Sequence, residues 1–517
     1  MTQSIGYAWL AETFDIPIVQ PLPVRSEIGK RRKTIVDGEG RIEIYTEAMR
    51  PDAVPAAQMT FALKHEGVNL AFLARLFALL PPEILVDWVA SEPSGQYARR
   101  AGFFYEWLTG AELQIDEIAI RGNYRDALNP SHYLTAATSA RNSRWRINDN
   151  LPGTRAFCPQ VRRTPQVLAA ERYDCRHALS AVEAEFGEDI LRRSAVWLTV
   201  RESRASFVIE KEGQESDRIQ RFAAAMAHYC GQLAEPLSPS SLGRLQQSIL
   251  GRSTIEWGLR QSPVFVGSSS LQDGPIVHYV CPHWSWLSAM LGGLQSFLSR
   301  TSAELAIVRA AVASFGFVFI HPLADGNGRV SRFLINDCLR RDGATPDGVI
   351  LPVSATITLS QRKRLEYDRI LEQYSRPLMA RYVDAVHFGE RRRYADGIES
   401  DMMFDAYEDA GATWRYPDLT SQVVYLFGVI KQTIESEMPA QASLQRAWYR
   451  ARLAIKDHLE GPDDHIDRII RGVRMNGGVS NKLRKEFPDL EDKALADRIE
   501  SAIAKSFEDI RKSAEAE

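Results

Sequence analysis

The 517-residue sequence lacks most features that would assign it to a specialised class of protein. It has only five cysteines, none spaced as CxxC, which argues against a disulfide framework and a zinc site and favours a reducing cytoplasm. Its net charge is −3, so overall charge indicates neither a nucleic-acid nor a membrane partner. No run of about 18 uncharged apolar residues occurs. The N-terminus carries no basic region followed by an apolar one, so we expect neither a membrane span nor a signal peptide.

Alternating, strand-like patterns are also scarce, and helical periodicity dominates, which predicts a mainly α fold. At about 100–200 residues per domain, the length predicts two to four domains. We expect a mainly helical N-terminal domain with some strand near 41–49, a linker with a leading helix, a central domain and a C-terminal helical domain, over residues 1–150, 151–194, 195–390 and 391–517. The charge-rich segment 388–403 marks the last boundary.

Two segments raise the question of nucleic-acid binding. Residues 139–165 hold six arginines and one acidic residue, and form either a connector that packs across two domains or a basic groove. We favour the connector because the segment is short and has a single tryptophan, Trp145. Residues 476–503 form either a small helix-turn-helix or a plain helical docking domain, and we favour the docking domain. A nucleic-acid partner is therefore possible but unsupported.

The most informative stretch is HPLADGNGRVSR, from His321 to Arg332, directly after the uncharged segment 310–320. That segment is too apolar for a surface helix, so it predicts a buried one. Pro322 cannot continue a helix, and an amphipathic pattern resumes after the glycines at 326 and 328. The loop therefore lies at a helix N-terminus, where free N–H groups and the helix dipole favour an anion.

The polar residues of this stretch suit a polyphosphate. Arg329 and Arg332, at i and i+3, share one face of the first turn, and their guanidinium forks bind phosphate oxygens. Asn327 adds an amide donor, and Asp325 offers a hard oxygen for Mg²⁺ shared with phosphates. His321, with an ordinary pKa of about 6.5, accepts a proton from an attacking hydroxyl at neutral pH. These features predict phosphoryl or nucleotidyl transfer, without the GxxxxGK[ST] of a P-loop.

At this point the sequence resembles the Fic family, whose pattern is HPFx(D/E)GNGRxxR. Only Leu323, in place of Phe, departs from it. The resemblance implies a helical enzyme that transfers AMP from ATP to a Ser, Thr or Tyr hydroxyl of a target protein. Doc-type kinases of the family carry Lys in place of Gly326, which favours AMP transfer here. Carried over by position, the resemblance implies a general base at His321, a Mg²⁺ ligand at Asp325, α-phosphate contacts at Gly326, Asn327 and Gly328, and outer-phosphate contacts at Arg329 and Arg332.

The segment 258–267, GLRQSPVFVG, resembles the family's entry into a β-hairpin flap, expected over 264–282. Such a flap clamps a target segment by strand addition, and we assign Val266, Gly267 and Tyr279 to it. An ordinary hairpin is the alternative. Farther along the chain, we place Tyr367 over the adenine, with a core aromatic as the alternative.

Upstream, SRASFVIEKEG resembles the family's inhibitory helix, (S/T)xxxE(G/N), expected over 199–212. Ser206 and Glu210 lie at i and i+4 on one helix face. The resemblance implies that Glu210 pairs with Arg332 and diverts it from the γ-phosphate. Lys211 departs from the usual Gly or Asn, and the alternative is a surface glutamate on an amphipathic helix.

Three readings of function follow. The first is a self-inhibited protein adenylyltransferase that uses ATP and Mg²⁺ and acts on an unidentified protein. The second keeps the site but uses another nucleotide donor, or removes AMP from modified targets with Glu210 positioning water. The third is a nucleotide-binding regulator with a DNA-binding domain over 391–517. Family members often use dimer contacts, so a homodimer is possible.

Overall fold

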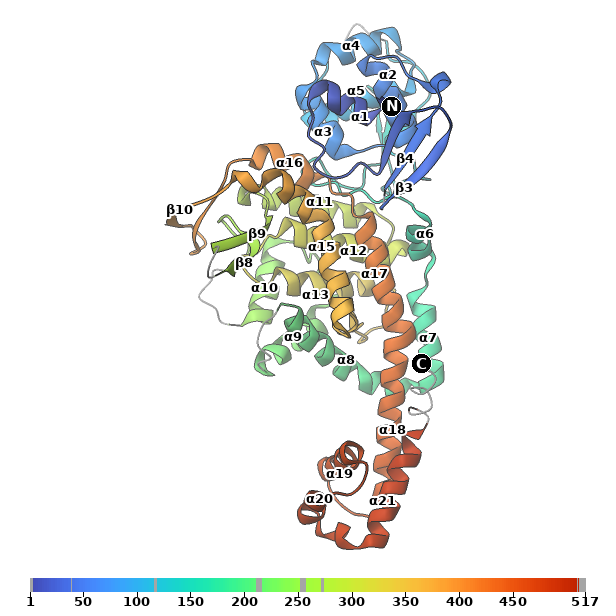
Figure 1. Cartoon of the computed structure of the whole chain (residues 1–517), viewed down its shortest axis with the longest axis vertical. Helices are drawn as coiled ribbons and strands as arrows, with labels where there is room; N and C mark the ends of the chain where they lie inside the picture. The colour runs from blue at the N-terminus through green and yellow to red at the C-terminus, as the bar shows by residue number, and fades with distance from the viewer. Residues whose placement is uncertain are drawn as a thin grey trace. The chain divides into compact units, whose positions relative to one another are not determined.

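Figure 1 shows the computed structural model. In the part of the chain that the structure describes, α-helices predominate, as predicted, and there are four small sheets. The contacts divide the chain into two compact units. Unit 1 comprises residues 1–173, 203–344 and 357–428, and unit 2 comprises 174–202, 345–356 and 429–517. The structure describes residues 3–38, 40–115, 119–210, 216–251, 257–270, 274–508 and 510.

The first part of unit 1 combines five helices with two sheets. The strand expected near 41–49 is β4, in a sheet of order β1-β2-β4-β3 in which β2 and β4 are parallel. A second sheet has the order β5-β7-β6. The helices are α1 (Tyr7–Phe14), α2 (Pro55–Phe61), α3 (Leu70–Leu79), α4 (Pro82–Ser91) and α5 (Gln96–Thr109), and the strands are β1 (Gln3–Ile5), β2 (Val24–Ile28), β3 (Lys33–Asp37), β4 (Gly40–Tyr45), β5 (Arg125–Asp126), β6 (Ala140–Asn142) and β7 (Ile147–Asp149).

The arginine-rich segment 139–165 is anchored by its tryptophan. Trp145 is fully buried, and its indole N–H donates to the Glu106 carboxylate at 2.7 Å. A Cβ on Gly102 of α5 would lie 2.2 Å from the Trp145 ring, so this close packing needs a glycine. A ring buried in this way is not available to stack on a base, which supports the packed-connector interpretation.

The rest of unit 1 is built around α12 (Ala306–Ile320) and α13 (Asn327–Arg341), which pack against each other (Figure 1). Residues 303–320 are long and apolar enough to cross a membrane, but 78% of that window is buried inside the protein, as in a core helix. Surrounding elements are α6 (Pro165–Arg172), α9 (Ser216–Tyr229), α10 (Pro239–Leu250), α11 (Leu287–Arg300), α15 (Gln361–Tyr382), α16 (Tyr407–Arg415), the start of α17 (Thr420–Gln432) and the hairpin of β8 (Phe265–Ser270) and β9 (Gly274–Val280).

The charge-rich segment 388–403 differs from its sequence interpretation. It forms a second hairpin of β10 (Val386–Arg393) and β11 (Glu399–Phe404) inside unit 1, so the region after 390 begins with strands rather than helix. The register shifts between Phe388 and Arg392, which interrupts the two-residue alternation that would have marked the strand. The Phe388 ring lies edge-on to Phe265 of β8, with centroids 5.7 Å apart.

Unit 2 is helical in the residues that the structure describes. Its core includes Ile466, Ile470 and Ile499. The segment 476–503 forms two helices joined by a 3₁₀ turn (Pro488–Glu491), and its DNA-binding role stays a prediction. The helices are α7 (Cys175–Phe186), the first part of α8 (Glu188–Ile209), α14 (Val353–Ile357), α18 (Met438–Lys456), α19 (Asp463–Asn476), α20 (Asn481–Glu486) and α21 (Lys493–Ser506).

Candidate active site

His321 caps the C-terminal end of the buried helix α12. Its backbone is left-handed, with φ 50° and ψ 57°, and its N–H closes the helix on the Phe317 carbonyl at 2.9 Å. The imidazole Nδ1 lies 3.3 Å from the Val318 carbonyl. Because a carbonyl only accepts, Nδ1 carries the hydrogen in this contact, which leaves the Nε2 lone pair to accept a proton.

The protonation state of His321 also suits a base. Burial lowers the pKa of this imidazole from 6.5 to about 4, and the charge of Arg260 adds to the effect against weaker opposing contributions from Val318 and Glu210. In the absence of nucleotide the ring is therefore neutral throughout the physiological range.

We expect an NMR titration of the nucleotide-free protein to show a His321 midpoint near pH 4. Between pH 6.5 and about 4 the unfolded chain binds a proton at this residue that the folded chain does not. Falling pH in this window therefore lowers the free energy of unfolding, and His321→Asn removes that contribution. A midpoint near 6.5 would contradict the buried, neutral ring.

Asn327 holds the loop rather than pointing outward. Its Oδ1 accepts from the Leu323 N–H at 2.9 Å and its Nδ2 donates to the Leu323 carbonyl at 2.7 Å. The side chain is buried, so the prediction that its amide donates to a phosphate is wrong for this conformation. Gly326, with φ 90°, precedes α13 in the left-handed region, where its missing Cβ avoids strain.

Arg329 contacts the loop from the first turn of α13. Its guanidinium contacts Asp325 Oδ1 at 3.0 Å and lies over the Phe207 ring at 5.2 Å. The same Asp325 oxygen accepts from the Gly326 N–H at 2.6 Å, while the side chain remains 48% exposed. Asp325 thus combines anchoring within the loop with access from solvent.

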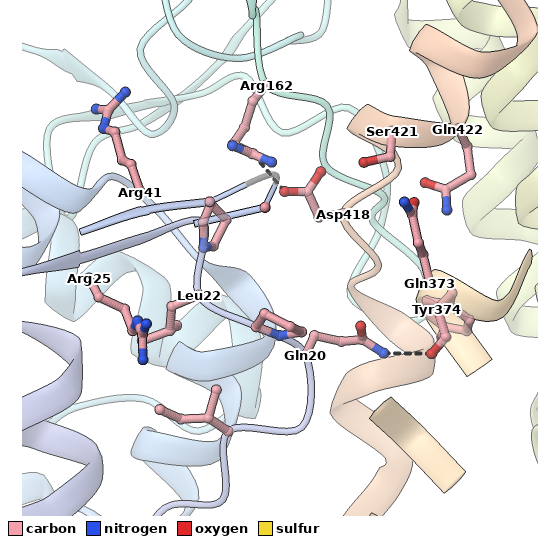
Figure 2. A pocket seen from close by; sticks show the side chains of 15 residues that line it. Gln20, Leu22, Arg25, Arg41, Arg162, Gln373, Tyr374, Asp418, Ser421 and Gln422 are labelled. Atoms are coloured by element: carbon pink, nitrogen blue, oxygen red, sulfur yellow. Dashed lines mark hydrogen bonds and ion pairs between the residues drawn. The ribbon is translucent and has the colours of Figure 1, made fainter. Parts of the chain in front are cut away.

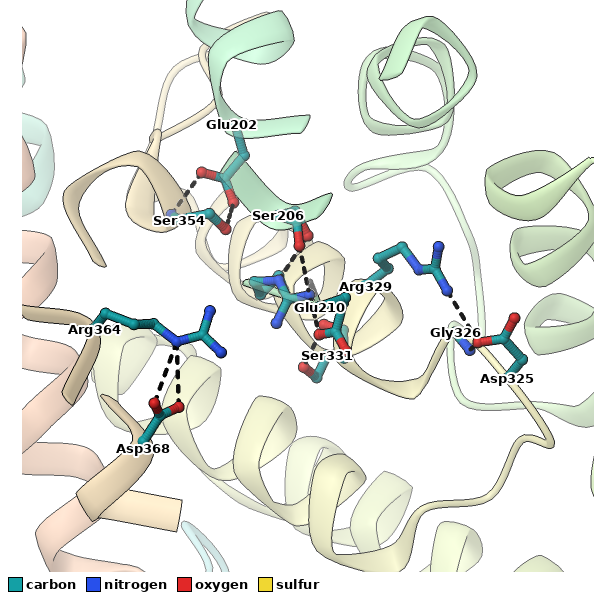
Figure 3. Close-up of polar contacts among 12 residues, drawn as sticks. Glu202, Ser206, Glu210, Asp325, Gly326, Arg329, Ser331, Ser354, Arg364 and Asp368 are labelled. Carbon is teal, nitrogen blue, oxygen red and sulfur yellow. Dashed lines mark hydrogen bonds and ion pairs between the residues drawn. The ribbon is translucent and has the colours of Figure 1, made fainter. Parts of the chain in front are cut away.

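Arg332 is held by Ser206 of the upstream helix and by Glu210 directly after it, and Figure 3 labels these two partners. Its Nε donates to Ser206 Oγ at 2.6 Å, and its Nη2 donates to Glu210 Oε1 at 2.5 Å. Burial alone would raise the pKa of the Glu210 carboxyl, but the charge and hydrogen bond of Arg332, with Arg329, lower it overall. The structure therefore contains the Glu210–Arg332 contact that the resemblance implied.

Gly328 makes room for this pair. A Cβ at position 328 would lie 2.0 Å from Glu210 Oε1 and 3.2 Å from Arg332 Nη2. Residues 199–209 of the expected inhibitory helix belong to α8, and Glu210 follows its last turn. Lys211, where the sequence departs from the family pattern, lies outside the described residues, as does 212.

Tyr367 is placed in the core rather than on an open surface. It is 8% exposed, and its ring centroid lies 6.2 Å from that of Tyr425. Burial raises the pKa of its hydroxyl, while the charge of Arg332 acts in the opposite direction. The structure therefore favours the core-aromatic alternative over an adenine lid.

The predicted flap is a two-stranded antiparallel hairpin; its residues 271–273 lie outside the described residues. Val266 is 43% exposed, as expected for a surface that meets a target. The register shifts between Val266 and Gly267, and a Cβ on Gly267 would lie 2.2 Å from the Ile276 carbonyl. Tyr279 is different: it is buried and its hydroxyl donates to the Phe319 carbonyl, so assigning it to the target surface was wrong.

Arg260 is a positioning residue that the sequence interpretation missed. It is 2% exposed, and its guanidinium donates to three backbone carbonyls: His321 at 2.8 Å, Ser262 at 2.7 Å and Pro282 at 2.6 Å. The backbone N–H of Arg260 donates to the Pro322 carbonyl at 2.9 Å. One side chain thus joins both ends of the hairpin to the loop. The available signal was an arginine between Gly258 and Gly267, a few residues before the start of β8.

We expect Arg260→Met to lower the free energy of unfolding by about 3 kcal/mol, because three buried carbonyls lose a charged donor. Thermal and urea unfolding measure this. Arg244→Met, which removes an exposed guanidinium in α10, is the matched control and should have little effect. Equal stability of the two variants would contradict the positioning role.

The comparisons with known proteins agree on one domain. The Fic/DOC family matches residues 236–339. A protein adenylyltransferase Fic of Aedes aegypti is 36% identical over 106 residues, covering 20% of this chain and 19% of the relative. One of Drosophila willistoni is 27% identical over 251 residues, covering 47% and 43%. This chain therefore spans less than half the length of these curated relatives.

A solved Fic family protein from Desulfovibrio desulfuricans G20 is 20% identical and covers 62% of this chain and 83% of its own, with a TM-score of 0.33. The family match includes the flap, the loop and most of α13, which carry His321, Asp325 and Arg332. Residues 236–339 of this chain are a Fic domain of the Fic/DOC family.

Proposed function

We propose that this chain is a self-inhibited protein adenylyltransferase that transfers AMP from ATP to a Ser, Thr or Tyr hydroxyl of a target protein. The observation that carries the proposal is a neutral imidazole at the C-terminal end of α12, in the loop that leads into the N-terminus of α13 with its two arginines. Relatives named protein adenylyltransferase Fic match 106 and 251 residues of this chain.

In the proposed reaction, the target hydroxyl loses its proton to Nε2 of His321 as its oxygen attacks the α-phosphorus of ATP. A bond forms between that oxygen and phosphorus, the bond to the β-phosphate bridge breaks, and pyrophosphate leaves. The Nδ1 contact with the Val318 carbonyl holds the ring in the tautomer that this step needs.

The phosphates would lie at the N-terminus of α13, where backbone N–H groups and the helix dipole favour an anion. Mg²⁺ would neutralise phosphate charge when bound, and Asp325, a half-exposed hard oxygen donor, fits as its protein ligand. The described residues contain no group of three or more His, Cys, Asp or Glu side chains that could hold a metal ion.

We propose self-inhibition because the Arg332 guanidinium is buried and already hydrogen-bonded. Its guanidinium is only 2% exposed and is committed to Ser206 and Glu210. A γ-phosphate that needs this fork must compete with a carboxylate already bonded to it at 2.5 Å. Glu210 thereby disfavours the triphosphate geometry that puts the α-phosphorus in line with the attacking hydroxyl.

Label transfer tests the reaction. Purified protein and Glu210→Gly are incubated with Mg²⁺ and either α-labelled or γ-labelled ATP. We expect protein-bound label from the α-position only, and more of it in Glu210→Gly. Label from the γ-position would mean phosphorylation instead, and label from UTP but not ATP would mean a different donor.

Removal of AMP is a second candidate, favoured by the position of Glu210 at the same loop, against Gly328. There a carboxylate would orient water toward the phosphorus of a modified target. Loss of AMP from a pre-modified protein, abolished by Glu210→Gln, would identify this activity.

A further inference from the structure

The pocket of about 650 Å³ that Figure 2 shows lies in unit 1, on residues other than those of the loop at 321–332. Two of its guanidiniums already have carboxylate partners, since Arg162 contacts Asp418 at 2.8 Å and Arg41 contacts Glu43 at 3.0 Å. This pocket therefore offers a ligand little free charge. A clearer functional role belongs to a buried amide of α10, a helix that packs against α13.

Gln246 of α10 is completely buried, and both ends of its side-chain amide are hydrogen-bonded. Its Nε2 donates to the Asp325 carbonyl, and its Oε1 accepts from the Gly258 N–H, each at 2.9 Å. Because a carbonyl only accepts and an N–H only donates, these two bonds fix the orientation of the amide. One side chain thus connects the loop with the entry to the flap hairpin.

The two backbone segments that Gln246 connects already run side by side. Leu259 and Leu323 form an antiparallel bridge, and the Arg260 N–H donates to the Pro322 carbonyl at 2.9 Å. Gln246 therefore closes one end of a short two-stranded arrangement of the flap entry and the loop.

The bond to Asp325 restrains a whole peptide group. The Asp325 carbonyl and the Gly326 N–H belong to one planar unit, so holding the carbonyl also sets the direction of that N–H. The N–H donates to Asp325 Oδ1 at 2.6 Å, and Arg329 contacts the same oxygen at 3.0 Å. Gly326 has φ 90°, and a glycine tolerates either orientation of the peptide before it. Gln246 therefore supplies a restraint that the glycine itself lacks.

We propose that Gln246 is a positioning residue of the nucleotide site: through the Asp325–Gly326 peptide it holds the Asp325 carboxylate in place for Mg²⁺ bound to the phosphates. The inference rests on the proposed adenylyltransferase function, in which Asp325 is the metal ligand. Because Gln246 is fully buried, it acts only through this backbone and does not touch the nucleotide.

Calorimetric titration with ATP of the full chain carrying Glu210→Gly, in Mg²⁺ and in EDTA, tests the proposal. We expect Gln246→Met to weaken binding at least about fivefold in Mg²⁺, below the ~10–100-fold typical of groups bonded directly to metal ligands, and less than about twofold in EDTA. The effect should disappear when Asp325→Ala is also present, because the restraint then has no carboxylate to hold. Gln247→Met, at the exposed neighbouring position of α10, is the matched control and should leave both affinities unchanged.

Gln246→Glu separates the two ends of the amide and keeps the test open if Gln246→Met does not fold. Its carboxylate still accepts from the Gly258 N–H, but only its protonated form donates to the Asp325 carbonyl. Burial raises the pKa of such a carboxyl, so the affinity for ATP in Mg²⁺, relative to the parent at the same pH, should recover between about pH 8 and about pH 5.5.

Amide hydrogen exchange gives a readout that needs no nucleotide. The Gly258 and Gly326 amides should exchange faster in Gln246→Met than in Gln247→Met. Unchanged exchange, an equal loss of affinity in Mg²⁺ and in EDTA, or an undiminished loss in the Asp325→Ala background would overturn the positioning role. Absence of ATP binding in the Glu210→Gly parent would instead refute the proposed nucleotide site, and the role of Gln246 with it.

Discussion

Replacing Glu210 with glycine is expected to raise incorporation of α-label by at least about tenfold, because a hydrogen bond between charged groups is worth about 1.5–3 kcal/mol. The substitution frees the Arg332 guanidinium for the outer phosphates while leaving Ser206 in place. Initial rates of self-labelling, and of labelling of any identified target, measure the effect.

Glu235→Gly is the matched control, since it removes an exposed carboxylate elsewhere in unit 1. Its labelling should equal that of the wild type. Ser206→Ala should give a smaller rise, because Arg332 loses its Nε contact but keeps Glu210. Unchanged or lower labelling in Glu210→Gly would refute an inhibitory role for this carboxylate.

Replacing His321 with alanine in the Glu210→Gly background is expected to lower the transfer rate by roughly 10²–10⁴-fold, the usual contribution of a positioned general base. ATP binding should change little, because the phosphate contacts lie on α13. Initial rates and the Kd for ATP separate the two effects.

His321→Asn makes this test sharper. The residue has φ 50°, and asparagine adopts that conformation more readily than alanine does. An equally inactive His321→Asn with a wild-type thermal midpoint would assign the loss to the missing base. Activity within threefold of the parent in either variant would remove His321 from the mechanism.

The two helices around the loop were predictable because their signals are local. A fully apolar segment, a proline after His321 and paired glycines predict a buried helix, a break and a new N-terminus, and α12 and α13 follow this pattern. The Glu210–Arg332 pair joins residues 122 positions apart, so only the resemblance could suggest it.

The residues that were misjudged depend on tertiary contacts that no local pattern contains. Asn327 was read as a phosphate donor, yet both ends of its amide are bonded to Leu323. In the flap, the alternating pattern of a strand separates its side chains into two faces but does not say which face packs against the core. The bulge at Gly267 also interrupts the alternation that would assign Tyr279 to one of these faces. Arg260 acquires its role only when three separate carbonyls converge on it.

The two partners of the Glu210–Arg332 pair differ in their freedom to move. The arginine side chain is 2% exposed and fixed within α13, whereas the glutamate side chain is 33% exposed and lies beyond the last turn of α8. Release of the guanidinium therefore requires only a rotamer change of a partly exposed side chain, an event of picoseconds to nanoseconds when unhindered. Under the proposed self-inhibition, the wild type should therefore retain a low basal rate of AMP transfer. That rate is set by the fraction of time that the Glu210 side chain is turned away from Arg332.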